Sequence, residues 1–231
     1  MKTILENDRD FVCDIHAPCF QNLLPEEAEL VKAGKTQVLF RKGETLTKQG
    51  AFATYILFMV NGLAKQYLEG DGTRNFNLRI IPPGEFLGLS AVFSAGTFNY
   101  SAVAITECRV FLIEKDAIAR VIINNGTFGF NMTKRFCEQN SSLYGTVSNL
   151  IYKQMNGRLA ETLLYLDTLR VYQDDIFQLM SRKDIAEFAG ISTESAVKLL
   201  KSFEKDGLVE LREKDIRLIN LALLGEISRR G

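Results

Sequence analysis

Hydroxyl, carboxylate and ammonium groups recur along one short stretch near the C-terminal end of the sequence. Thr193, Glu194 and Ser195 come first, and Lys198 and Lys201 follow at a spacing that a helix places on one face. A carboxylate can accept a hydrogen bond from the amino group of cytosine, and an ammonium can donate to O6 and N7 of guanine. If this stretch lies on an exposed helix, its side chains are predicted to contact the base edges of duplex DNA.

The residues around this stretch predict that helix and a second one before it. Ser181 begins the first helix as a capping box with Asp184, because each side chain can bond to the other's backbone N–H. Gly190 permits a tight turn, and Ser192 caps a second helix from Thr193 to about Asp206. Two alternating segments, 208–211 and 216–219, then predict a wing hairpin. Helix, turn, helix and wing together indicate a winged helix-turn-helix.

In a helix-turn-helix the N-terminal end of the second helix enters the major groove. We therefore expect Ser192, Thr193, Glu194, Ser195, Lys198 and Lys201 to meet DNA, and Ser181, Arg182 and Lys183 to hold phosphates. The competing interpretation is that these charges are a solvated helix face. From Ser181 to the C-terminus there are ten basic and nine acidic residues. Non-specific binding should consequently be weak and strongly dependent on salt.

The N-terminal half carries the signals of short strands. From about Leu39 to Ile113, glycines separate short runs rich in Val, Ile, Phe and Tyr, which is typical of a β-roll or barrel. Gly70-Asp71-Gly72 supplies the residues of a tight turn between 63–68 and 74–80. These features predict a double-stranded, cupin-like β-roll.

A helical period follows, in which apolar residues recur at intervals of three, four or seven from Phe128 to Leu150. A helix from about 127 to 153 would be roughly 40 Å long, more than one small domain needs for its own core. Its apolar stripe predicts pairing with the same helix of a second subunit. The alternative is that it packs wholly on its own β-roll. A second helix is expected from about Gly157 to Val171.

Composition limits the other classes of function. The chain has 231 residues, 46% of them hydrophobic and 24% charged, with a formal net charge of zero. This is typical of an ordinary globular protein. Neither a membrane-spanning run nor a signal peptide is expected, so we predict a cytoplasmic protein without a membrane partner. With a single histidine, His16, and no nucleophile motif or phosphate loop, an enzyme is not expected.

The sequence resembles the Crp/Fnr family of transcription regulators along nearly its full length. Residues 185–200 look like the helix-turn-helix of that family, and 83–88 (Pro-Gly-Glu-Phe-Leu-Gly) is similar to its effector-cassette glycine motif. Residues 116–169, including Arg158-Leu159-Ala160-Glu161-Thr162-Leu163-Leu164, look like its linker and dimer helix. The family usually carries arginine where Lys198 stands, and lysine lacks the planar fork of arginine.

The effector segment departs from what the resemblance implies. Cyclic-nucleotide binders of this fold use a glutamate after the second cassette glycine and an arginine before a serine or threonine. Here Leu89 replaces the glutamate, and 97–101 contains no arginine. A buried phosphate without a cation would be poorly compensated, so cyclic AMP is not expected to bind by the usual mode, and no cofactor is predicted. The candidate effector pocket comprises Gly84, Glu85, Phe86, Leu87, Gly88, Leu89, Asn99, Tyr100 and Ser101. It is either an apolar pocket or one filled by its own side chains.

Two of the four cysteines support an alternative function. The gap between Cys13 and Cys19 resembles part of the cluster-binding segment of the oxygen-sensing branch of the family, which uses four thiolates. His16 lies between them and could add a metal ligand. The alternatives are therefore an iron-sulfur or metal-dependent redox regulator, or reduced thiols without a metal.

Together these patterns predict an α+β protein in three parts. Residues 1–126 form a β-roll sensing domain, 127–153 a dimerisation helix, and 154–231 a winged helix-turn-helix domain. The expected partners are double-stranded DNA and a second copy of the chain. RNA polymerase is a further partner that gene activation would require.

Overall fold

The computed structural model describes residues 2–3, 20–70, 74–94 and 96–231. By their contacts the residues form two units, one of 1–69 with 79–142 and one of 70–78 with 143–231.

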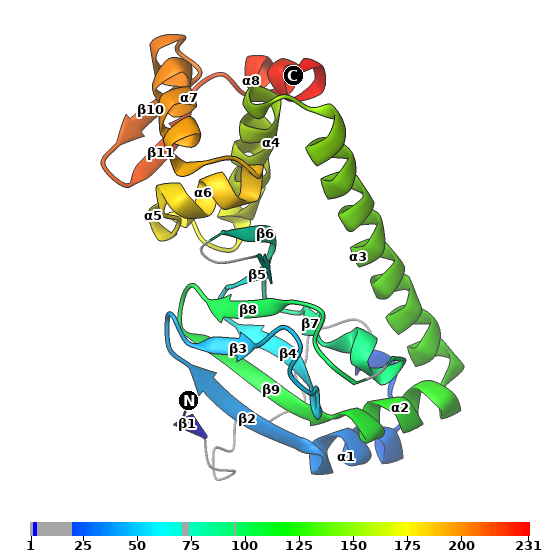
Figure 1. Cartoon of the computed structure of the whole chain (residues 1–231). Helices are drawn as coiled ribbons and strands as arrows, with labels where there is room; N and C mark the ends of the chain where they lie inside the picture. The colour runs from blue at the N-terminus through cyan, green and yellow to red at the C-terminus, as the bar shows by residue number, and fades with distance from the viewer. Residues whose placement is uncertain (1, 4–19, 71–73, 95) are drawn as a thin grey trace. The chain divides into compact units, whose positions relative to one another are not determined.

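Two antiparallel sheets form the roll of the first unit (Figure 1). The five-stranded sheet has the order β1-β2-β9-β4-β7, and the four-stranded sheet has the order β3-β8-β5-β6. The strands are β1 (Lys2–Thr3), β2 (Lys35–Phe40), β3 (Thr45–Thr47), β4 (Tyr55–Asn61), β5 (Ala64–Glu69), β6 (Asn75–Ile81), β7 (Phe86–Leu87), β8 (Ser101–Ala104) and β9 (Cys108–Glu114). The expected β-roll is confirmed.

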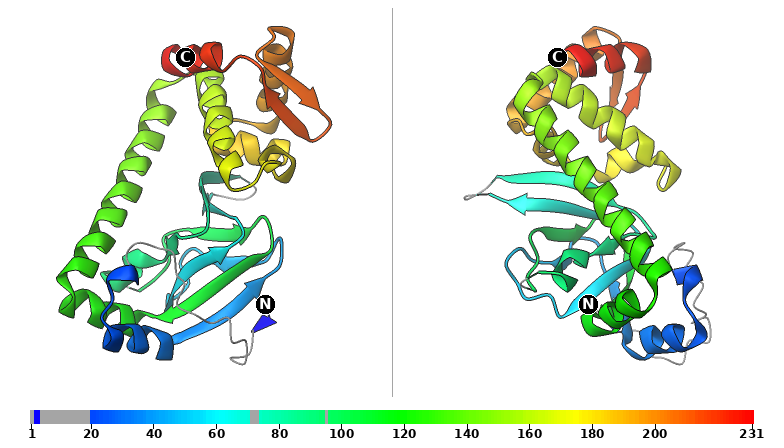
Figure 2. Two further views of the ribbon diagram at one scale, coloured as in Figure 1. Left: turned by 180° about the vertical axis from the view of Figure 1, so that it is seen from behind. Right: turned by 90° about the vertical axis from the view of Figure 1, so that its right-hand side faces the viewer.

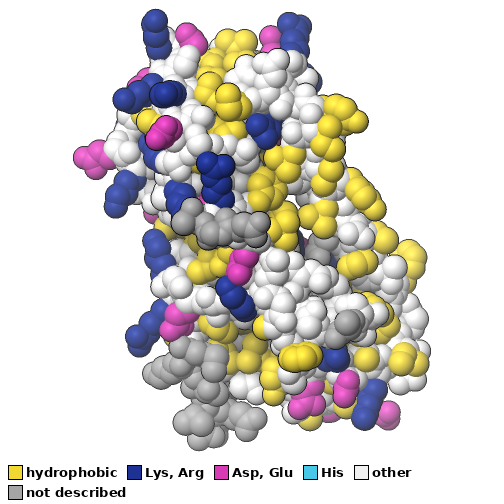
Figure 3. Space-filling model, in the orientation of Figure 1, with side chains coloured by type: hydrophobic (Ala, Val, Ile, Leu, Met, Phe, Trp, Pro, Cys, Tyr) yellow, Lys and Arg dark blue, Asp and Glu magenta, His cyan; other side chains and the backbone are white. Residues whose placement is uncertain are grey.

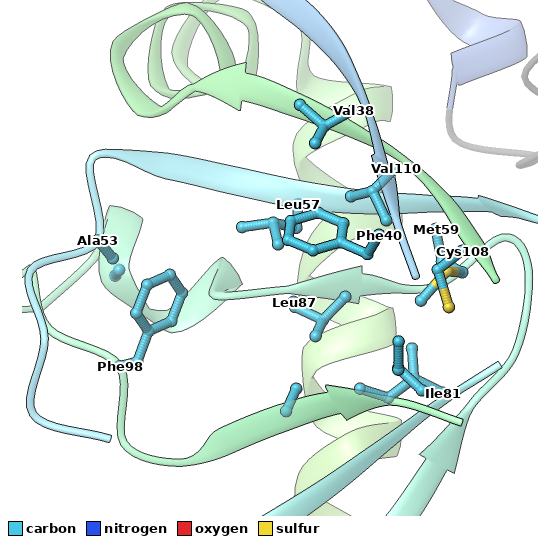
Figure 4. Close-up of a cluster of buried hydrophobic side chains, with 14 residues drawn as sticks. Val38, Phe40, Ala53, Leu57, Met59, Ile81, Leu87, Phe98, Cys108 and Val110 are labelled. Carbon is cyan, nitrogen blue, oxygen red and sulfur yellow. The ribbon is translucent and has the colours of Figure 1, made fainter. Parts of the chain in front are cut away.

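One hydrophobic core lies between the two sheets. Leu57 and Met59 of β4 and Val110 of β9 point into it from the five-stranded sheet, and Ile81 of β6 points into it from the other (Figure 4). Ala102 of β8 belongs to the same core. Because side chains alternate along a strand, the neighbouring residues of β4 and β9 face the other way. β4 is therefore buried on both faces, as its continuous apolar run requires.

A second core covers the outer face of the five-stranded sheet. Phe58 of β4, Phe111 of β9 and Phe86 of β7 pack there against Phe20 and Phe128. The Phe20 and Phe58 ring centroids are 5.3 Å apart in an edge-on arrangement, which aromatic quadrupoles favour. The covering elements are the 3-10 turn η1 (Phe20–Asn22), α1 (Pro25–Ala33), the 3-10 turn η2 (Leu89–Val92), α2 (Lys115–Asn124) and the start of α3 (Gly126–Tyr152).

The second unit is mainly helical (Figure 2). Its elements are the end of α3, α4 (Met155–Thr168), the 3-10 turn η3 (Leu169–Val171), α5 (Ile176–Leu179), α6 (Arg182–Ala189), α7 (Thr193–Lys205), β10 (Val209–Arg212), β11 (Asp215–Leu218) and α8 (Leu221–Arg230). α4 packs against α6 and α8, and its buried residues include Leu159, Leu163 and Leu166. The small residues Ala186 and Ala196 are buried, which lets α6 and α7 pack closely.

Within the described ranges, no helix combines the length and the apolar character that crossing a membrane requires.

Candidate nucleic-acid interface

The first helix of the motif begins with the expected cap. The Ser181 hydroxyl accepts the N–H of Asp184 at 3.0 Å, and the Asp184 carboxylate accepts the N–H of Ser181 at 2.9 Å. Two N–H groups that lack a partner inside α6 are thereby satisfied. Ser181 and Lys183 remain exposed, and the Lys183 ammonium lies 3.7 Å from the Glu187 carboxylate.

Gly190 makes the turn between the helices in the left-handed conformation, with φ of 61° and ψ of 39°. A Cβ at this position would lie 2.7 Å from the Leu150 Cδ2 atom. The glycine is therefore required by its backbone angle, and any side chain here would also have to displace the end of the Leu150 side chain.

Substituting Gly190 should destabilise the second unit. We expect Gly190→Val to lower the free energy of unfolding by about 1–3 kcal/mol, because a β-branched residue is strained at positive φ. Gly225→Ala is the matched control, since its Cβ would meet only the end of Arg229 at 3.6 Å within α8. It should be neutral or stabilising by up to about 1 kcal/mol. Urea denaturation of both variants measures the difference, and equal effects would show that the turn does not require glycine.

The second helix presents its first turn to solvent. The Ser192 hydroxyl accepts the N–H of Ser195 at 3.1 Å and so caps α7 as expected. Thr193 and Glu194 are exposed, and Ser195 is half-buried. The cap fixes the direction of the helix axis while leaving these side chains available to a partner.

One face of α7 carries a row of charged side chains. Glu194, Lys198, Lys201 and Lys205 follow each other at intervals of four, three and four, and all are exposed. This spacing places them on one side of the helix, opposite the buried Ala196, Leu200 and Phe203. Figure 3 shows Lys and Arg side chains over the part of the surface that α7 and the β10–β11 hairpin occupy.

The wing is a tight hairpin. Arg212 pairs with Asp215, which leaves Glu213 and Lys214 as the two turn residues, with Glu213 at φ of 45°. The Leu211 N–H donates to the Glu204 carboxylate at 3.0 Å and so joins the wing to α7.

Arg182, expected to hold a phosphate, has a different contact in the structure. Its Nη2 donates to the carbonyl oxygen of Glu213 at 3.3 Å, so it joins the start of α6 to the tip of the wing. Burial lowers the pKa of Arg182, against the opposing effect of Asp215. Arg182 is thus placed to position the wing. The wing itself exposes Lys214 and Arg217, which were predicted as part of the hairpin but not as DNA-binding residues.

The start of the predicted stripe of α3 packs on the chain's own roll, because Phe128 and Met132 are buried in its second core. A different apolar stripe of the helix is exposed. Phe130, Cys137, Tyr144 and Ile151 recur every seven residues, and all four are exposed in the single chain. Figure 3 shows hydrophobic side chains along this helix. A seven-residue recurrence is typical of helices that pack on a parallel partner.

In the effector segment, both cassette glycines have positive φ, 87° at Gly84 and 78° at Gly88. Phe86, Leu87 and Leu89 are buried in the cores of the roll, whereas Asn99 is exposed. The three apolar residues therefore belong to the hydrophobic cores of the roll, and the two glycines form turns of its backbone.

Two further residues of the segment have internal partners. The Tyr100 hydroxyl accepts the N–H of Gly88 at 2.8 Å. The Ser101 hydroxyl donates to the Glu69 carboxylate and accepts the N–H of Gln49 at 2.9 Å. The Lys48 ammonium, and after it Ser101, lower the pKa of Glu69, so a charged carboxylate lies beside Ser101 at neutral pH.

Cys13, His16 and Cys19 lie outside the described residues, so their alternative role is untested. Cys108 is buried, and its thiol donates to the Leu63 carbonyl at 3.2 Å. Cys137 is exposed on α3. Among the described residues, no group of three or more His, Cys, Asp or Glu side chains could hold a metal ion.

Cys108 should be inert in the folded protein. Burial raises the pKa of its thiol to about 11, so at pH 8 roughly one thiol in a thousand would be a thiolate. We expect iodoacetamide to leave Cys108 unmodified in native protein and to modify it in urea, as read by peptide mass spectrometry. Modification at equal rates in both conditions would contradict the buried position.

Two family models match the chain. A cyclic nucleotide-binding domain matches residues 37–125, and a Crp-like helix-turn-helix domain matches residues 157–227. The two matches together span more than half of the chain, and they confirm the helix-turn-helix.

Curated relatives align over nearly their whole length. The cyclic AMP receptor protein of Thermus thermophilus is 23% identical over 212 residues, which cover 92% of this chain and 97% of that protein. A CRP-like cAMP-activated global transcriptional regulator of Mycobacterium tuberculosis is 23% identical over 222 residues, with the same coverage.

Solved structures show the same fold. A transcriptional regulator of the Crp/Fnr family from Eubacterium rectale has a TM-score of 0.77 at 17% identity and covers 92% of this chain and 98% of its own. FixK2 from Bradyrhizobium japonicum has a TM-score of 0.73 at 22% identity and covers 84% and 96%. With the two domain matches, these findings show that the chain belongs to the Crp/Fnr family of DNA-binding transcription regulators, which are not enzymes.

Proposed function

We propose that two copies of this chain pair through α3 and bind a two-fold DNA site, with one α7 in each of two successive major grooves. The observation that carries the proposal is the first turn of α7, which is capped, fixed to a folded unit and exposed. The stripe on α3 supports the pairing, because large apolar side chains repeated along an exposed face favour a partner.

Within this complex, the residues have separate roles. Glu194 and Lys198 reach base edges, because they stand at the N-terminal end of the recognition helix. Ser181, Lys183 and Lys201 hold phosphates, and the wing adds Lys214 and Arg217 to that set. Arg182 positions the wing through its bond to the Glu213 carbonyl.

The roll acts as the sensing domain and biases the two DNA-binding units through α3, by a shift between two arrangements. Its signal is not cyclic AMP held in the usual way. Tyr100 and Leu89 stand where cyclic-nucleotide binders carry an arginine and a glutamate, and the Glu69 carboxylate would repel a phosphate at Ser101.

Native mass spectrometry of the full chain with a pool of random duplexes tests the proposal. The expected result is a complex of two protomers with one duplex, unchanged in amount when cyclic AMP is added. A complex containing one protomer, or no duplex binding at low salt, would overturn the dimeric DNA-binding function. A clear increase with cyclic AMP would overturn the statement about the signal.

A further inference from the structure

Three polar side chains, those of Arg79, Arg135 and Gln139, approach Glu85 at the edge of the roll. The Arg79 Nη1 atom of β6 donates to the Glu85 carboxylate at 3.0 Å, and its Nε donates to Gln66 of β5 at 2.9 Å. From α3, Gln139 donates to the same carboxylate at 3.1 Å, and the nearest Arg135 nitrogen lies 3.9 Å from it. Arg135 also donates to the Gly84 carbonyl at 2.8 Å.

This cluster has more donors than acceptors. A guanidinium carries more N–H groups than the bonds of Arg79 or Arg135 use, and within the described part of the chain Glu85 is the carboxylate that pairs with both arginines. Two positive charges thus face one negative charge, so the two arginines can attract an anion that competes with Glu85.

The cluster is also within reach of solvent. The side chains of Arg79, Arg135 and Glu85 are 21%, 23% and 27% exposed. A small solute can reach groups with this exposure, whereas the surrounding protein still weakens screening by water. By contrast, Phe86 and Leu87, which directly follow Glu85 in the chain, are fully buried.

We propose that Arg79 and Arg135 bind a small oxyanion, the carboxylate of an organic acid or a phosphate, in exchange for Glu85. The inference rests on the proposed sensing role of the roll and names the chemistry of its signal. The two arginines come from β6 and α3, so this site differs from one built on an arginine before Ser101. A bound anion would take over the bonds that Glu85 makes to Arg79 and Gln139.

Such an exchange would act on α3. Arg135 and Gln139 are one helical turn apart, and both bond to the 84–85 loop. Because an anion would compete with Glu85 for these side chains, its binding would change how the loop is attached to the helix. The consequence is a coupling between ligand and dimer helix that needs no cyclic nucleotide.

Titration calorimetry of the full chain tests the proposal, with succinate and orthophosphate as separate probes at constant ionic strength. We expect saturable binding of succinate or of orthophosphate. The probe that binds shows whether the site takes a carboxylate or a phosphate. Arg79→Gln and Arg135→Gln should each weaken that binding on the order of tenfold or more, since each removes a charge-assisted hydrogen bond. Arg109→Gln, which changes an exposed arginine elsewhere on the roll, should leave it unchanged.

Glu85→Gln gives the sharpest result. Removal of the competing carboxylate should strengthen binding of the anion by roughly tenfold. A purely structural role of Glu85 predicts the opposite, weaker binding together with lower stability. The proposal is overturned if neither probe binds saturably, if Arg109→Gln weakens binding as much as the other variants, or if Glu85→Gln weakens it. The assay contains no DNA, so its failure and a failure of DNA binding are separate results.

Discussion

Replacing both Tyr144 and Ile151 with glutamate is expected to convert the protein to a monomer and to weaken its binding to a two-fold duplex by about 100-fold or more. Both side chains belong to the α3 stripe and are 74% and 65% exposed in the single chain. Pairing would bury them, and buried unpaired carboxylates are costly. A monomer binds each half-site independently and loses the advantage of the second contact.

Sedimentation equilibrium measures the oligomeric state of this double variant, and fluorescence anisotropy measures its affinity for DNA. Phe52→Glu is the matched control, because Phe52 is 84% exposed on the roll and does not belong to the stripe. It should remain a dimer with unchanged affinity. If the double variant also remains a dimer with normal affinity, the protomers do not pair through this face of α3.

Replacing Lys198 with alanine is expected to remove the preference for one base pair in each half-site. The difference in binding free energy between that base pair and the others should fall by about 1–3 kcal/mol. Lys198 is exposed on α7, directly after the capped first turn of that helix. An ammonium in the major groove donates to guanine, so the penalty for substituting that base should disappear in the variant. Competition between the preferred duplex and single-base variants of it measures the change.

Two other lysines of α7 are the controls. Lys201→Ala should weaken binding about equally for all sequences and reduce the salt slope by about one, because it removes a phosphate contact. Lys205→Ala lies in the last turn and should have little effect on sequence preference. An equal loss on every duplex after Lys198→Ala would instead assign a phosphate contact to Lys198.

Local signals account for the features that the sequence predicts best. The caps and the turn of the helix-turn-helix are formed by hydrogen bonds between residues three or four positions apart, at Ser181 with Asp184, at Gly190 and at Ser192. Their roles therefore follow from sequence spacing alone. The apolar period from Phe128 to Leu150 likewise predicts a helix from 127 to 153, and the structure has one from Gly126 to Tyr152. The expected helix 157–171 is observed as α4 and the short turn η3.

Contacts between distant residues account for what was missed. The Arg182 partner lies 31 positions away in the wing, and the arginines around Glu85 lie on β6 and α3. A repeating pattern in a single sequence cannot show which distant residues contact each other. α8 was also missed, although Asn220 accepts the Leu223 N–H at 3.0 Å as its cap, a signal that the sequence does contain.

Sequencing of the duplexes that the full chain selects from a random pool tests whether the protein binds DNA as a two-fold dimer. We predict a two-fold palindrome whose half-site centres lie about one helical turn, roughly 10 base pairs, apart, since each protomer presents one α7. Recovery of no enriched sequence, or of a single site without two-fold symmetry, would contradict it.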